Sequence, residues 1–134
     1  MTIATADRNT AHKDGELVRV PVAGAVKILG GTIVCASATG FGTPGATAAT
    51  LAYLGMADEC VDNTAGADGA LTVGVRLGRA FKWANDGGDP VTQASLGRPC
   101  YIVDNQTVAK TNGAGTRSQA GIVVGIDADG VWVK

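Results

Sequence analysis

The sequence has few of the side chains that carry most enzyme chemistry. It contains one histidine, His12, and three cysteines, Cys35, Cys60 and Cys100, spaced too widely for a CxxC metal or redox motif. The histidine lies in the polar first fifteen residues, so the folded part offers no Ser-His-Asp or Cys-His site and no multi-histidine metal site. We expect three buried, reduced thiols in a cytosolic protein, and no enzymatic activity, cofactor or metal.

Charge and long apolar runs are also scarce. Charged residues make up 17% of the chain and the net charge is −1, so no basic surface is available to neutralise phosphates. No apolar run approaches the roughly 18 residues that span a bilayer, and residues 1–16 lack the apolar stretch of a secretory signal. These absences predict no nucleic-acid partner and no membrane association.

Glycine, in contrast, is abundant. The chain has 20 glycines, about twice the average usage. Glycine weakens helices and permits positive φ, so this composition favours many turns over long helices.

Short alternating segments between these turns predict an all-β fold. In residues 71–77, the side chains of Leu71, Val73, Val75 and Leu77 share one face. Similar segments are expected to form strands at residues 17–22, 26–29, 32–36, 51–60, 79–83, 99–103, 106–109, 121–127 and 131–133. For residues 51–60 a short helix is the alternative, and the interruption by Gly55 favours the strand. We therefore predict a small barrel or sandwich of about nine short strands.

Local turn signals refine this prediction. Pro21 cannot donate to a strand ladder, which places its strand at an edge or bulge. The pair Gly30 and Gly31 predicts a hairpin, and the pair Asp129 and Gly130 predicts a second, tight one. Residues 39–49 are expected to form a loop.

One short helix is predicted at residues 90–96. Asp89 is a good N-cap, Pro90 suits the first helical position and Gly97 suits the C-terminal cap.

The chain divides by composition into two parts. Residues 1–15 are polar and predict a flexible N-terminal arm, while residues 16–134 predict a single β-rich domain. The arm is either an idle terminus or a segment that becomes ordered on a partner. Its residues Thr2, Ile3, Ala4, Thr5 and Ala6 are small or β-branched, which suits an added strand on another chain's sheet.

Several motifs have ordinary explanations. A GxGxxG pattern at residues 40–45 lacks a following helix and fits chance in a glycine-rich chain. Asp58, Glu59 and Asp62 suggest a solvated turn rather than acid–base chemistry. Phe81 and Trp83 share one strand face. They are either core residues, which is the commoner role for such aromatics, or part of an interface.

Five segments resemble small capsid decoration proteins, also called cement proteins, of tailed bacteriophages. They are NTAHKDGELVRVPV, YLGMADECVD, LTVGVRLGRAFKWAN, PCYIVDNQTVAK and GIVVGIDADGVWV, which together span most of residues 9–133. The resemblance implies a β-rich structural protein that binds the outside of an assembled shell and clamps neighbouring major capsid protein subunits. It also implies a homotrimer on the capsid, an N-terminal arm on the major capsid protein, and a virion protein made in the host bacterial cytoplasm.

Two other functions stay open at this stage. The chain could be a β-barrel domain of a phage tail or head fibre, which predicts a longer partner or fusion. It could also be a small-ligand-binding β-barrel, which predicts a concave pocket lined by aromatic residues.

Overall fold

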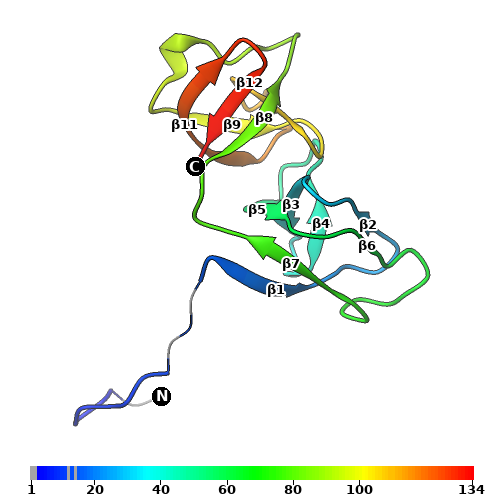
Figure 1. Cartoon of the computed structure of the whole chain (residues 1–134), viewed down its shortest axis with the longest axis vertical. Helices are drawn as coiled ribbons and strands as arrows, with labels where there is room; N and C mark the ends of the chain where they lie inside the picture. The colour runs from blue at the N-terminus through cyan, green and yellow to red at the C-terminus, as the bar shows by residue number, and fades with distance from the viewer. Residues whose placement is uncertain (1–2, 12, 14) are drawn as a thin grey trace.

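The computed structural model describes residues 3–11, 13 and 15–134, and these residues confirm the all-β prediction. Figure 1 shows an upper and a lower β-structured half, with the N-terminal segment running away from the lower one. The described residues form twelve strands: β1 (Leu17–Pro21), β2 (Lys27–Ile28), β3 (Ile33–Ala36), β4 (Gly42–Pro44), β5 (Ala52–Ala57), β6 (Val61–Asp62), β7 (Thr72–Arg76), β8 (Phe81–Asn85), β9 (Pro99–Ile102), β10 (Thr107–Ala109), β11 (Gln119–Asp127) and β12 (Gly130–Val133).

The first half is a five-stranded antiparallel sheet with a two-stranded ribbon beside it. The sheet order is β1-β7-β5-β3-β4, and β2 pairs with β6 in the ribbon. Strand β1 lies at the sheet edge, as Pro21 predicts. The strand predicted at residues 71–77 forms as β7 with Val73 and Val75 buried, but Leu71, predicted on the same face, lies before the strand and is 43% exposed, and Gly74 on the other face is buried. A single parallel bridge from Val22 to Gly42 brings the end of β1 towards β4, so the sheet curls back on itself.

The second half is a closed barrel of five strands in the order β10-β8-β12-β11-β9. The β8–β10 pair is parallel and the other pairs are antiparallel. The predicted tight hairpin forms, but its two-residue turn is at residues 128–129, one residue earlier than predicted, because Gly130 already pairs with Asp127. Gly78, at φ 70°, makes the corner between β7 and the barrel.

The predicted hairpin at Gly30 and Gly31 is wrong. A turn does form there, with Gly31 at φ 79°, but the strands on either side do not pair with each other. Strand β2 pairs with β6, and β3 lies between β4 and β5. β2 therefore takes a partner more than thirty residues away, while β3 pairs with the next strand, β4, and with β5. The predicted loop at residues 39–49 is also partly wrong, because it contains β4.

The predicted helix at residues 90–96 is reduced to one 3-10 turn, Gln93–Ser95. Its N-cap is Thr92 rather than Asp89. The carboxylate of Asp89 instead accepts hydrogen bonds from the Thr111 side chain, at 2.5 Å, and from Arg117, at 2.9 Å. These long-range bonds compete with the capping role, while Gly97 still adopts a positive φ of 78° after the turn.

Strand β3 divides the core into two clusters. Ile33 and Cys35 point into the cluster that fills the barrel, and Val34 points into the cluster of the first half. Backbone and side-chain hydrogen bonds also join the halves, among them Ile33 N to Asn105 O at 2.8 Å and Thr47 Oγ1 to Val103 O at 2.7 Å. The two halves therefore pack on a shared wall.

Candidate functional site

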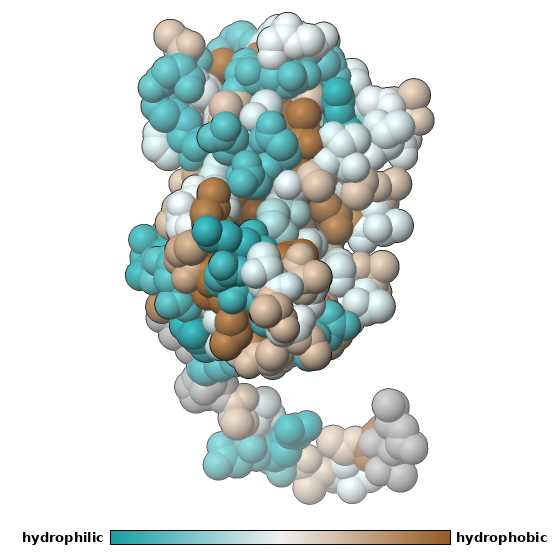
Figure 2. All heavy atoms as spheres, turned by 90° about the vertical axis from the view of Figure 1, so that its right-hand side faces the viewer, coloured by the Kyte–Doolittle hydropathy of each residue, from teal (hydrophilic) through white to brown (hydrophobic). Residues whose placement is uncertain are grey.

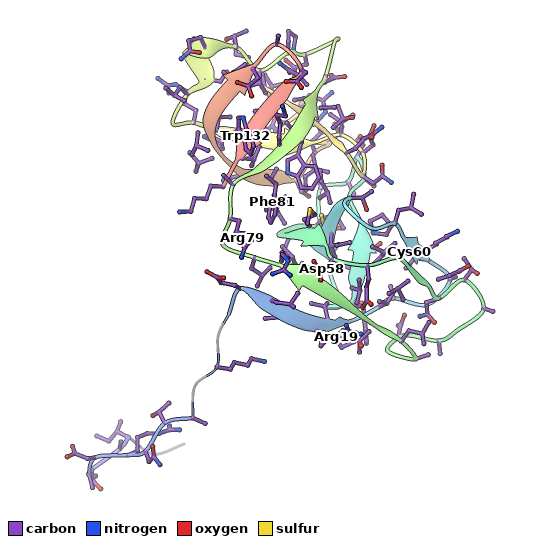
Figure 3. All side chains as sticks on the ribbon, in the orientation of Figure 1. Arg19, Asp58, Cys60, Arg79, Phe81 and Trp132 are labelled. Carbon is purple, nitrogen blue, oxygen red and sulfur yellow. The ribbon has the colours of Figure 1, made fainter. Side chains whose placement is uncertain are left out.

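The N-terminal arm is the most exposed segment of the described chain. Residues 3–11 and 13 contain no strand or helix, and all of them are exposed. Ile3 is 87% exposed although it is a large apolar residue. Figures 1 and 3 show the segment leading away from β1. Of the predicted arm residues, Ile3, Ala4, Thr5 and Ala6 lie on this exposed segment, whereas Thr2, like His12, lies outside the described residues.

The arm leads directly into a free sheet edge. Arg19 of β1 lies opposite Gly74 of β7. The Gly74 N–H donates to Glu59, and the Gly74 carbonyl accepts from the Asp58 N–H, so both groups point away from β1. Arg19 and Gly74 therefore form a non-hydrogen-bonded pair, and the backbone groups of Arg19 face the outer edge. An unpaired edge of this kind is a template for pairing with another chain.

The Arg19 side chain holds this edge strand in place. Its guanidinium donates to Glu59 Oε1 at 2.7 Å and to Thr72 Oγ1 at 3.1 Å. Both partners belong to the first half, and the Arg19 side chain itself remains 60% exposed. Figure 3 shows Arg19 on β1, distant from Trp132 on the barrel.

Phe81 and Trp83, the predicted core or interface residues, both lie on β8. Trp83 is 5% exposed and belongs to the barrel core, where its indole N–H donates to the Tyr53 hydroxyl at 3.0 Å. Phe81 is half-buried, and its ring centroid lies 5.9 Å from that of Trp83. Of the two, only Phe81 presents part of its ring to solvent.

Trp132, within the strand predicted at residues 131–133, is 37% exposed. Its indole N–H donates to Asp127 at 2.8 Å, and the Lys82 ammonium lies 5.6 Å from the ring centroid. Lys82 also pairs with Asp129 at 2.9 Å. Other large apolar side chains on the barrel are exposed as well, namely Leu96, Ile122 and Val124. On the face seen in Figure 2, apolar residues form separate patches among hydrophilic ones.

The cysteines correct one sequence expectation. Cys35 and Cys100 are buried and free, as predicted, but Cys60 is exposed. Burial raises the pKa of the Cys35 thiol to about 12 and that of Cys100 to about 11, so both stay protonated and unreactive near neutral pH. Cys60 follows the short β5 strand, where the alternating pattern that signals burial has already ended.

The acidic residues singled out in the sequence have structural partners. Asp58 pairs with Arg76 at 2.8 Å, and Glu59 pairs with Arg19. Asp62 accepts hydrogen bonds from the side chain and backbone of Thr64, which lower its pKa. Within residues 3–11, 13 and 15–134, no group of three or more potential ligands is arranged to hold a metal.

A surface pocket of about 460 Å³ lies on the outside of the barrel, and sequence patterns gave no sign of it. Its wall is formed by residues in and just after the 3-10 turn, on β9, and directly after β10. Two of them, Arg98 and Lys110, are cationic, and Tyr101 contributes an aromatic ring.

No family model, curated protein or solved structure matches the chain. Among the described residues, no helix has the length and apolar character that crossing a membrane requires. The function is therefore inferred from the arm, from the free edge of β1 and from the packing of the body, the β-structured part of the chain at residues 16–134.

Proposed function

We propose that the chain is a capsid decoration protein of a tailed bacteriophage. It binds the outer surface of the assembled shell and clamps neighbouring major capsid protein subunits. The observation that carries this proposal is the exposed segment at residues 3–11, which leads from a β-rich body and has no hydrogen bond to that body.

The arm has the chemistry of a strand that pairs with another chain. Ile3 and Thr5 are β-branched, Ala4 and Ala6 are small, and none of the four carries a charge. Strand addition draws its affinity from main-chain hydrogen bonds, so a plain sequence is sufficient, with one apolar anchor for specificity. Ile3 supplies that anchor, because it is the large apolar side chain that the described arm exposes.

The body suits a clamp. Its two halves share hydrogen bonds and a common wall at β3, so load applied to one half is transmitted to the other. A shell filled with DNA is under internal pressure, and many bound copies stabilise the assembled lattice by mass action. The net charge of −1 disfavours competing attachment to that DNA.

The resemblance adds the expected assembly. In this proposal the chain forms homotrimers on the capsid, at local three-fold positions, and belongs to the virion exterior after synthesis in the host cytoplasm. The barrel does not favour the ligand-binding alternative in its usual form, since buried side chains such as Val108, Val123 and Val131 occupy its interior.

Cryo-electron microscopy of virions from the phage that encodes the chain tests this proposal. We expect density for the body outside the shell, in symmetric clusters, with residues 2–6 added to a strand of the major capsid protein. Density in a tail or fibre, or no density on a shell known to contain the chain, would overturn it.

A further inference from the structure

The pocket on the outside of the barrel brings together two cations that have no partner in the protein. The other arginines of the body form ion pairs: Arg19, Arg76, Arg79 and Arg117. In the part of the chain that the structure describes, neither Arg98 nor Lys110 has an ion pair or a side-chain hydrogen bond. Both nevertheless line the same pocket.

The backbone of both cations is held by the fold. The Arg98 N–H donates to Ser95 O, and the Arg98 carbonyl accepts from Val123 N, both at 2.9 Å. The Lys110 N–H donates to Asp89 O at 3.0 Å. The backbone at both positions is therefore fixed, and the two exposed side chains extend from it at the pocket.

The carboxylate of Asp89, the residue whose backbone carbonyl holds Lys110, already has other partners. Asp89 Oδ2 accepts hydrogen bonds from the Thr111 backbone and hydroxyl and from Arg117. This carboxylate is therefore bonded to Arg117 and to Thr111, which itself lines the pocket. The positive charge of Arg98 and Lys110 remains available to a ligand.

The remaining wall is largely apolar. Ala94, Pro99 and the Tyr101 ring contribute it, and the volume of about 460 Å³ is at the lower end of the range for small-molecule sites. A guanidinium binds a carboxylate through two parallel hydrogen bonds, and an ammonium adds a point charge. We propose that this pocket binds a small organic carboxylate with a planar apolar body, the carboxylate between Arg98 and Lys110 and the body against Tyr101. This site is independent of capsid binding.

Titration of the isotope-labelled full chain with sodium benzoate, followed by amide chemical shifts at constant ionic strength, tests the proposal. We expect saturable shifts at residues 94–101 and 109–111, and weaker binding of acetate, which lacks the planar body. The R98Q/K110Q variant should raise the benzoate dissociation constant roughly tenfold or more, because both charge-assisted contacts are lost.

The matched control is K27Q/K134Q, which removes the same charge from two exposed lysines outside the pocket. It should bind benzoate as the parent chain does. The proposal is overturned if both double variants weaken binding equally, if acetate or inorganic phosphate binds as tightly as benzoate, or if the shifts do not saturate.

Discussion

Tyr53 and Trp83 meet where the two halves pack together. Tyr53 belongs to β5 of the first half and Trp83 to β8 of the barrel, and they share one hydrogen bond of 3.0 Å. Burial raises the pKa of Tyr53 to about 12, so the hydroxyl is neutral over the physiological range. It can then accept from the indole N–H while the aromatic rings remain in the core.

Replacing Tyr53 with Phe should reduce the free energy of unfolding by about 1–2 kcal/mol, because the buried Trp83 N–H then has no acceptor. The matched control is Tyr101→Phe, since no hydrogen bond of the Tyr101 hydroxyl occurs among the described residues. Urea unfolding followed by tryptophan fluorescence measures both variants. Equal losses would show that the Tyr53 hydroxyl contributes nothing specific.

The buried thiols make stability depend on pH. Cys35 and Cys100 have folded-state pKa values of about 12 and about 11, above the ordinary thiol pKa of about 8.5 in an unfolded chain. Their contribution to the free energy of unfolding is complete below about pH 8.5, the pKa in the unfolded chain, and is lost as the pH rises towards the folded-state pKa values. Between pH 8 and pH 10 each thiol ionises in the unfolded chain but not in the folded one, which should lower the free energy of unfolding by about 2 kcal/mol per thiol.

Urea unfolding at pH 8 and pH 10 under reducing conditions tests this dependence. The C35A/C100A variant should lose less stability between the two pH values than the parent chain does. The exposed thiol provides the control. The Cys60→Ala variant should lose as much stability between pH 8 and pH 10 as the parent chain does. Identical losses in the double variant and the parent would contradict the assignment.

At the scale of elements, Gly55 shows how tightly β5 is placed. A Cβ atom at this position would lie 2.0 Å from the Arg76 carbonyl oxygen of β7, with the Phe81 ring also close. The register between β3 and β5 shifts next to it, between Val34 and Cys35. The bulge brings backbone against backbone, and only glycine leaves room for that approach.

Gly55→Ala should therefore destabilise the fold by more than about 2 kcal/mol, because β5 and β7 must separate. Gly87→Ala is the control, since a Cβ there meets nothing within 4 Å and should leave stability nearly unchanged. Thermal unfolding monitored by circular dichroism compares the two variants. A Gly55→Ala protein as stable as Gly87→Ala would mean that β5 and β7 do not approach so closely.

The sequence predicted those features of individual strands and turns that depend on the local residue pattern. β7 was predictable because one of its faces is buried and alternation marks that face, and the edge position of β1 followed from Pro21. The pairing of β2 with β6 was not predictable, because no local signal selects a partner more than thirty residues away. The lost helix has the same cause, since Thr111 and Arg117 are distant from Asp89 in sequence.

The candidate site divides in the same way. The arm was visible in the sequence because, apart from Met1, it has only one large apolar residue, Ile3. The sequence did not decide whether Trp83 is a core or an interface residue. Alternation shows that Phe81 and Trp83 lie on the same face of a strand, but it does not show what covers that face. The pocket cations, Arg98 and Lys110, meet only through the β9–β10 pairing, which the alternation pattern does not contain.

At the scale of the whole molecule, one strand explains the two-part body. β3 is buried on both faces, with Ile33 and Cys35 towards the barrel and Val34 towards the first sheet. A strand of this kind appears in sequence as a continuous apolar run, which shows burial but not the presence of two separate clusters. The described arm residues belong to neither cluster, so removing the arm should leave folding largely unchanged.

The most direct test of the central claim is co-sedimentation with empty, expanded shells of the parent phage. A variant lacking residues 2–14 should melt at the same temperature as the full chain, because the described arm makes no hydrogen bond to the body, yet it should bind the shells at least about tenfold more weakly. Ile3→Asp should weaken binding in the same direction. Leu29→Asp, which changes an exposed leucine on the body, should not. Unchanged shell affinity of the truncated, folded protein would contradict the account.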